Sequence, residues 1–142
     1  MTANFINGET MTNTALSAHN LDARTFEPGQ GSVVLPLPHI SYENGFDVSR
    51  GYDSFTAGES GFYYICYRVG SEPGGIISSS LHRNGTPLPV LTDAAANAGT
   101  RSGAAVIFLN TGDCLRLVIT GNGSKIKLRE GAGASLNIIK IA

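Results

Sequence analysis

Charged side chains are scarce in this chain of 142 residues: Asp, Glu, Lys and Arg make up 15% of it, and the formal net charge is −1. Without an excess of either sign, the molecule has no overall field that would attract nucleic acid or an anionic membrane. No apolar run approaches the roughly 20 residues that a membrane-spanning helix needs. Residues 1–14 also lack the basic-then-apolar order of a secretory signal. We therefore expect no nucleic-acid partner and no insertion into a membrane.

Catalytic and metal-binding patterns are also missing. The three histidines, His19, His39 and His82, are scattered, whereas metal-binding jelly rolls of the cupin type carry two histidines two residues apart on one strand. No Gly-x-Ser-x-Gly nucleophile elbow is present either. The sequence therefore predicts a protein that is not an enzyme and that needs no cofactor.

One metal site stays open as an alternative. Asp47, Asp53 and Glu59 fall in neighbouring loops. Calcium is bound where about six or more oxygens converge, usually with two or three carboxylates among them. Three separately solvated carboxylates are the expected arrangement, and a surface calcium ion is the alternative.

Cysteine is represented only by Cys66 and Cys114. We expect both on strands, and in opposite sheets. A disulfide needs Cα atoms within roughly 7 Å of each other, which this placement disfavours. Two free thiols are therefore expected.

Glycine is abundant, with 18 copies, several of them in turn signals such as Asn44-Gly45 and Asn84-Gly85. Asn-Gly pairs tolerate the positive φ angles of tight hairpin turns. Short strands separated by such turns indicate one all-β domain, built as an antiparallel sandwich, a jelly roll or a barrel. The runs of strand length are 32–40, 52–56, 61–69, 76–83, 102–109, 114–120, 125–129 and 134–141.

The clearest of these strands is 61–69, with the sequence GFYYICYRV. Side chains alternate between the two faces of a strand, so one face here is suited to a core. The other face is mixed, as expected where a strand meets solvent or a neighbour. The same alternation in 76–83 and 114–120 extends the predicted core, whose members are Tyr63, Ile65, Tyr67, Leu81, Leu115, Leu117 and Ile119.

Three regions lack this clear alternation. Pro36 and Pro38 interrupt the run 32–40, and because proline cannot donate to a sheet ladder, we expect that strand at an edge or at the end of a sheet. Residues 1–20 are expected to form a poorly anchored segment with a short first strand near 12–18, and residues 21–142 the domain. The alanine-rich stretch 93–99 is expected to be a loop with at most one helical turn.

From residue 51 onward, a series of landmarks resembles the C1q/TNF-like family of trimeric jelly rolls. These are GYDSFT at 51–56, GFYYICY at 61–67, LHRNG at 81–85, SGAAVIFL at 102–109 and GDCLRL at 112–117. The ending ASLNIIKIA at 134–142 is most similar to the bacterial branch of that family. There, such domains cap collagen-like stalks on spore surfaces, as in the BclA glycoprotein of the exosporium.

The resemblance implies a C1q/TNF-like jelly-roll sandwich of two antiparallel sheets, with about ten strands. It also implies a non-enzymatic module that forms a homotrimer and trimerises or caps a bacterial surface assembly of the spore or exosporium type. Its location would be the cell or spore surface, or outside the cell. The chain contains neither a Gly-X-Y repeat nor a signal peptide. The alternative function is receptor or glycan recognition, as in a phage tail tip or an adhesin head.

In that family, the inner sheet packs around a threefold axis. The strands 76–83 and 114–120 each have a second face that is too mixed for a core, so we expect these faces at the trimer interface. The predicted contact residues are Ser78, Ser80, His82, Cys114, Arg116, Val118 and Thr120. His82 is expected to be a structural hydrogen-bonding group, with a proton-sensitive trimer contact as the alternative.

Lys125, Lys127 and Arg129 alternate with Ile126 and Leu128, which places three cations on one exposed strand face. A solvated surface that discourages edge pairing is the ordinary interpretation. The functional alternative is a small patch for anionic polymers. Surface glycans and host or matrix proteins are therefore expected partners beside the protein's own copies.

Overall fold

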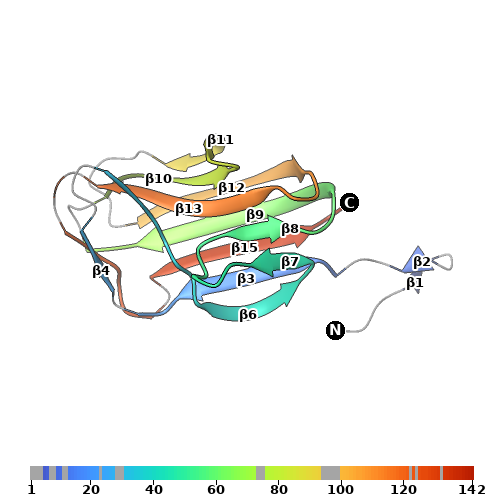
Figure 1. The fold of residues 1–142 in the computed structure, drawn as a ribbon, viewed down its shortest axis with the longest axis horizontal. Helices are drawn as coiled ribbons and strands as arrows, with labels where there is room; N and C mark the ends of the chain where they lie inside the picture. The colour runs from blue at the N-terminus through green and yellow to red at the C-terminus, as the bar shows by residue number, and fades with distance from the viewer. Residues whose placement is uncertain are drawn as a thin grey trace.

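The computed structural model describes residues 5–6, 9–10, 13–22, 24–27, 31–72, 76–93, 100–121, 123, 125–131 and 133–142, without the side chains of 5–6, 9–10 and 76–77. Two antiparallel β-sheets face each other across a common core (Figure 1). Among the described residues, no helix is long and apolar enough to cross a membrane. The expected all-β sandwich of two antiparallel sheets is confirmed.

One sheet has five strands, and we call it the five-stranded sheet. Its order is β12 (Thr100–Leu109), β9 (Gly61–Gly70), β15 (Ala134–Lys140), β3 (Ala15–Asn20) and β6 (His39–Asn44).

The other sheet, which we call the six-stranded sheet, has the order β11 (Thr86–Asp93), β10 (Ile76–Arg83), β13 (Cys114–Gly121), β8 (Phe55–Ala57) and β7 (Phe46–Val48), with β5 (Ser32–Val34) also paired to β13. Two short pairs lie outside both sheets: β4 (Thr25–Phe26) with β14 (Ile126–Lys127), and β1 (Phe5–Ile6) with β2 (Glu9–Thr10).

The core lies between the sheets because every second residue along the long strands points inward. In β9, for example, Tyr63, Ile65, Tyr67 and Val69 are all at most 2% exposed. The seven residues that the sequence predicts as core are all buried to this extent. Burying a large apolar side chain stabilises a fold by roughly 1.5–3 kcal/mol, so this layer supplies most of the driving force.

Pro36 and Pro38 mark the place where the chain crosses from one sheet to the other. The expected strand 32–40 is therefore divided: β5 ends at Val34 in the six-stranded sheet, and β6 begins at His39 in the five-stranded sheet. Leu35 and Leu37, beside the prolines, are at most 1% exposed. The prediction that this strand ends a sheet is confirmed.

Strand β11 is not among the strands that the sequence analysis predicts, and it contains Pro87 and Pro89. It lies at the edge of the six-stranded sheet. A proline has no N–H to donate, and at an edge it can face solvent without leaving an acceptor on a neighbouring strand unpaired. The turn that joins it to β10 has φ angles of 52° at Asn84 and 85° at Gly85, as the Asn-Gly pair predicts. Residues 94–99, which include most of the predicted loop at 93–99, lie outside the described residues.

Strand β3 belongs to the sandwich and lies between β15 and β6. Its burial alternates, with Leu16 and Ala18 at most 1% exposed. The anchored part of the chain therefore starts before residue 15 and not at residue 21, because an interior strand is held on both edges. Cys66 on β9 and Cys114 on β13 lie in different sheets, as expected, and both are free thiols.

Candidate functional site

The outward face of the five-stranded sheet carries most of the exposed apolar surface in the described part of the chain. Six of the nine exposed large hydrophobic residues lie on it, each between 41% and 54% exposed. We call them the apolar patch: Phe62, Tyr64, Val106, Phe108, Ile139 and Ile141. An exposed apolar cluster of this kind on one face usually marks an interaction surface.

Strand register brings the patch together from three strands. Phe62 on β9 lies opposite Phe108 on β12, and their rings meet edge to face with centroids 5.1 Å apart. Tyr64 lies between Val106 and Ile139 on the two flanking strands. The patch is therefore a continuous area at the end of the sheet near the C-terminus (Figure 1).

The face becomes polar farther along the same strands. Cys66 lies between Ala104 and Asn137, so its neighbours are small or uncharged. The Ser17 hydroxyl donates to Asn137 Oδ1 at 2.6 Å. This middle row separates the apolar patch from a third group of side chains.

That third group consists of three basic side chains, His19, His39 and Arg68, which we call the basic row. Arg68 lies opposite Ser135, Ser135 lies opposite His19, and His19 lies opposite His39. The two imidazole centroids are 6.1 Å apart. The row thus crosses four strands at one level of the sheet.

Hydrogen bonds hold His19 in place within the row. Its Nε2 lies 3.0 Å from the Ser17 hydroxyl oxygen and 3.3 Å from the Ser41 hydroxyl oxygen. Partial burial, and to a lesser extent the nearby His39, lower the pKa of His19 below its usual value. The folded chain therefore favours the neutral imidazole.

Carboxylates are missing from this face as far as its side chains are described. Its outward residues on β12, β9, β15 and β3 are apolar, polar or basic. On the edge strand β6, the exposed Glu43 pairs with the inward-facing Leu16 and so belongs to the other side of the sheet. The Asp93 carboxylate, from the opposite sheet, accepts a hydrogen bond from the Ser102 N–H at the edge of β12, and Ser102 lies opposite Arg68. The basic row has no acidic group of its own to neutralise it.

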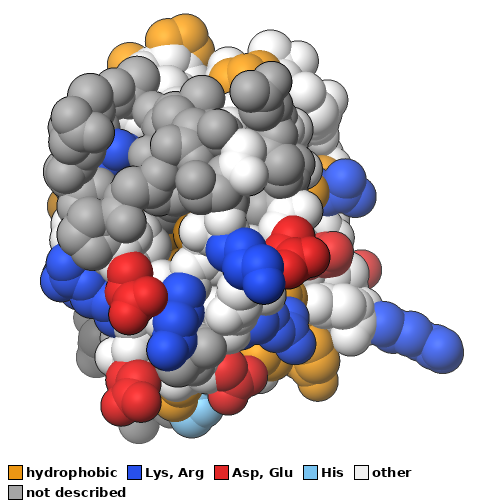
Figure 2. All heavy atoms as spheres, turned by 90° about the vertical axis from the view of Figure 1, so that its left-hand side faces the viewer, with side chains coloured by type: hydrophobic (Ala, Val, Ile, Leu, Met, Phe, Trp, Pro, Cys, Tyr) orange, Lys and Arg blue, Asp and Glu red, His pale blue; other side chains and the backbone are white. Residues whose placement is uncertain are grey.

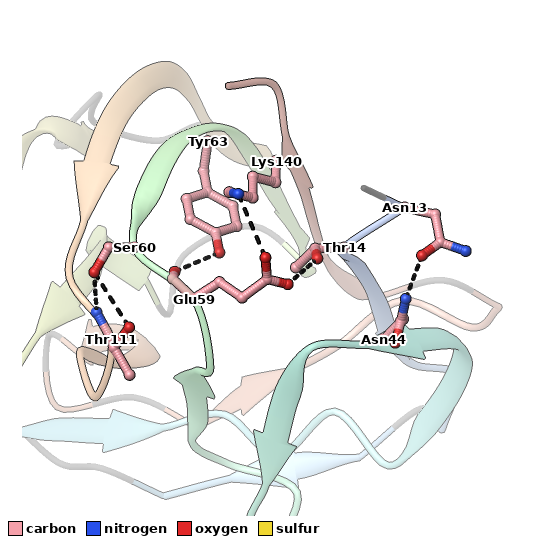
Figure 3. A network of polar contacts seen from close by, with 8 residues as sticks. All are labelled: Asn13, Thr14, Asn44, Glu59, Ser60, Tyr63, Thr111 and Lys140. Carbon is pink, nitrogen blue, oxygen red and sulfur yellow. Dashed lines mark hydrogen bonds and ion pairs between the residues drawn. The ribbon is translucent and has the colours of Figure 1, made fainter. Parts of the chain in front are cut away.

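A polar cluster around Glu59 holds the end of the sheet next to the apolar patch (Figure 3). The Glu59 carboxylate accepts a hydrogen bond from Thr14 and forms an ion pair with Lys140 at 3.4 Å, while the Tyr63 hydroxyl donates to the Glu59 carbonyl at 2.7 Å. The Thr14 hydrogen bond is the main reason why the pKa of Glu59 is lowered. This cluster ties the segments before β3 and β9 to β15.

The structure does not bring the three candidate calcium ligands together. Glu59 is engaged with Thr14 and Lys140, and Asp53 accepts a hydrogen bond from the Ser49 hydroxyl. Asp47 is exposed on β7. No cluster of three or more metal-binding side chains occurs within the described ranges.

The residues predicted at the trimer interface lie in the six-stranded sheet. Register pairs Ser78 with Thr120, Ser80 with Val118 and His82 with Arg116, so the structure does bring them together on one outward face. Cys114 begins the same strand. Ser80 and Val118 are only 8% and 6% exposed within a single chain, and burial lowers the pKa of His82. This face is polar and lies on the opposite side of the molecule from the apolar patch.

The predicted anion patch lies at the end of the sandwich that carries β4 and β14, where basic and acidic side chains are interspersed (Figure 2). Lys125, Lys127 and Arg129 are exposed while Ile126 and Leu128 are buried, as the alternation predicts. Lys125 forms an ion pair with Glu27 at 3.2 Å, and Arg129 Nε donates to the Ser71 carbonyl at 3.2 Å. Binding of anionic polymers here stays a prediction.

Sequence reasoning did not select the apolar patch or the basic row as a site. A signal for the patch was present, because the strands 61–69 and 102–109 both carry large apolar residues on each of their two faces. For the basic row no local signal exists, since His19, His39 and Arg68 meet only through strand pairing.

Comparisons with known proteins agree with this architecture. The solved structure of the Eiger TNF from S. frugiperda has a TM-score of 0.66 at 17% identity, covering 92% of this chain and 93% of that one. The globular domain of the zebrafish complement 1qA protein has a TM-score of 0.67 at 17% identity, covering 92% and 98%. Murine APRIL has a TM-score of 0.62 at 15% identity, covering 90% and 100%. At these identities, the likeness shows the fold.

No curated protein sequence matches the chain at a significant level. The model of the BclA C-terminal domain, in contrast, matches residues 16–142, from within strand β3 to the last residue. The predicted resemblance is therefore confirmed: the chain belongs to the family of BclA C-terminal domains and has a C1q/TNF-like jelly-roll fold.

Proposed function

We propose that this protein is a non-enzymatic interaction module that assembles as a homotrimer through the outward face of the five-stranded sheet. The observation that carries the proposal is the apolar patch, a cluster of six large side chains that a single chain leaves in water. Full burial of such a side chain contributes about 1.5–3 kcal/mol, and each of these is already about half buried, so covering it contributes roughly half of that. Six such side chains in each of three copies together gain enough to offset the entropy of association.

A second copy of the same chain is the occupant that fits this face best. The patch is neutral and the face lacks described carboxylates, so equivalent faces can approach without placing acidic groups together. The C1q/TNF-like fold supports a closed threefold arrangement, since trimers are the rule in that family. The proposed interface therefore moves from the face of His82 and Arg116 to that of Tyr64 and Val106.

The setting that we propose is a bacterial surface assembly of the spore or exosporium type, in which the trimer joins or caps other components. Membership of the BclA C-terminal domain family supports this setting. Labelling of intact spores and cells with an antibody against the domain tests it, because an internal protein would be labelled only after lysis.

The trimer is tested by the mass in solution and by a matched pair of variants. Light scattering should give about three times 14.8 kDa for the wild-type chain. Val106→Lys places three charges in the proposed interface and should produce a folded monomer. Val90→Lys changes a valine of similar exposure, 62% against 54%, on β11 in the other sheet, and should remain trimeric. A monomeric wild type, or trimers of both variants, would refute the proposal.

A further inference from the structure

We infer that the basic row makes self-association through the five-stranded sheet proton-sensitive, with copies held together near neutral pH and released as His19 and His39 become charged. The inference rests on the proposed trimer, because it concerns the same face. It adds a condition for assembly that the apolar patch alone does not impose.

New positive charge on the basic row would appear beside the proposed interface. The row lies on the same outward face as the apolar patch, separated from it by the level of Cys66 and Asn137. A partner that covers the patch therefore also approaches the two imidazoles. Histidine is the side chain whose charge ordinarily changes between pH 5 and 8, so protonation there alters the contact under mild conditions.

The groups that face the two histidines do not neutralise that charge. From β15 the row faces Ser135 and Asn137, from β6 His39 and Ser41, and from β9 the permanently charged Arg68. Neighbouring strands are about 4.8 Å apart, so Arg68 lies roughly 10 Å from His19 along the row. Each new imidazolium charge thus joins an existing cation. The Asp93 carboxylate lies beside Ser102 on β12, on the far side of Arg68 from the two histidines, so it does not face them.

Threefold symmetry multiplies the charge on this face. In a closed homotrimer each face is present three times, so two histidines per chain add six positive charges to the buried assembly. Unpaired like charges removed from water are strongly unfavourable. The separated chains accordingly bind more protons than the trimer does. By linkage, association must weaken as pH falls through the range in which histidine ordinarily gains its charge.

Burial of His19 works in the same direction. The Ser17 hydroxyl donates to Asn137 Oδ1 and the Ser41 hydroxyl donates to the Ser17 carbonyl. His19 Nε2 therefore donates to these two hydroxyl oxygens, and the hydrogen bonds position the ring without selecting its charge. Burial lowers the pKa of His19 already in the single chain, and covering by a partner extends that burial. The neutral form is therefore the one that the assembled state selects.

The test is sedimentation velocity over a concentration series at about pH 7.5, 6.5 and 5.5, with constant ionic strength. Wild-type association should be at least about tenfold weaker at the lowest pH, since each pKa unit of difference corresponds to a tenfold change in equilibrium constant. The double variant His19→Gln/His39→Gln should remove most of this dependence. Glutamine keeps a polar group near the position of Nε2 and does not titrate.

Two further variants make the result specific. His82→Gln removes a histidine from the outward face of the six-stranded sheet and should leave the pH dependence unchanged. Arg68→Gln removes the fixed cation from the row and should allow the trimer to persist to lower pH. Circular dichroism checks the folding of each variant. If the double variant is unfolded, His39→Gln, at an exposed position, should still reduce the pH dependence.

The outcomes separate this inference from the proposed function. A trimer whose affinity is the same at all three pH values, or a pH dependence that the double variant retains, overturns the proton-sensitive contact and leaves the trimer intact. A pH dependence that His82→Gln removes also overturns it. A wild-type chain that is monomeric at neutral pH refutes the proposed function and this inference together.

Discussion

The outward faces of the two sheets differ although their inward faces follow the same rule. On the five-stranded sheet, apolar and basic groups are segregated: the apolar patch occupies one end and the basic row the other. On the six-stranded sheet, polar and charged groups are mixed. Register there places Asp47 beside Thr56 and Thr56 beside Cys114, on the same face as Arg116 and His82.

This difference shows where to look for function in a β-sandwich. Both sheets bury every second residue, so inward alternation carries information about folding and none about partners. The outward residues distinguish the sheets, because among the described side chains only the five-stranded sheet leaves six large apolar groups exposed side by side. A face with both signs of charge is well solvated as a monomer, whereas the apolar patch is stabilised when it is covered.

The largest expected effects come from truncating core side chains on the inward faces of the two sheets. These variants test whether the two inward faces contribute equally to the stability of the fold. Leu136 on β15 and Leu117 on β13 are both fully buried. Replacing either with alanine should lower the free energy of unfolding by about 2–5 kcal/mol, from lost burial and the cavity left behind. Denaturant titration at one fixed protein concentration measures both, since assembly makes stability depend on concentration.

The comparison would break if one truncation cost less than about 1 kcal/mol while the other cost several, because the two inward faces would then not share one core. Pro89→Ala on the edge strand β11 is the control, since it removes little buried surface. It should leave the unfolding midpoint nearly unchanged.

Much of the sandwich was predictable from the sequence because its signals are local. The strands at 76–83, 114–120 and 134–141 coincide with β10, β13 and β15 to within one residue at each end. Glycine turns and alternating apolar residues define such strands without reference to any other part of the chain. Family landmarks lie in the same segments, so they reinforced these assignments.

The remainder depended on contacts that no local pattern encodes. Strand β11 contains two prolines and is tolerated only because it lies at an edge of its sheet. The alternation of apolar and polar residues also does not predict which sheet forms the interface. A strand face of mixed composition has the same sequence pattern whether water or a partner covers it. Val118 is an example. Its strand face suggests an interface, but the residue is already buried in the single chain, with an exposed fraction of only 6%.

A smaller effect is expected from the Glu59 cluster, which holds the strands under the apolar patch at one end. Glu59→Gln removes the ion pair with Lys140 and weakens the hydrogen bond from Thr14. Because the Glu59 side chain is 45% exposed, the loss of stability at neutral pH should be only about 0.5–1 kcal/mol. Chemical denaturation of the variant and of Asp47→Asn, an exposed control, measures it.

The pH dependence of that loss follows from the pKa direction. The Thr14 hydrogen bond lowers the pKa of Glu59 in the folded chain below its usual 4.5. The unfolded chain therefore binds the proton first, so this contribution is present above pH 4.5 and is lost as pH falls through the folded pKa. The difference between wild type and Glu59→Gln should shrink in acid. A difference that grows below pH 4.5 would contradict the assigned hydrogen bond.

The smallest effect is expected at the end of the sandwich between the two faces, where Lys125 pairs with Glu27. Both side chains are largely in water, at 74% and 68% exposure, so screening and side-chain entropy cancel most of the attraction. Lys125→Ala should change the free energy of unfolding by at most about 0.5 kcal/mol, and by less in 0.5 M salt. Lys127→Ala, on the same strand face, is the control. A loss of unfolding free energy larger than about 1 kcal/mol that persists in salt would show that this charged end stabilises the fold. The comparison of the two sheets implies that the core stabilises the fold while the outward faces bind partners, and such a loss would contradict that division.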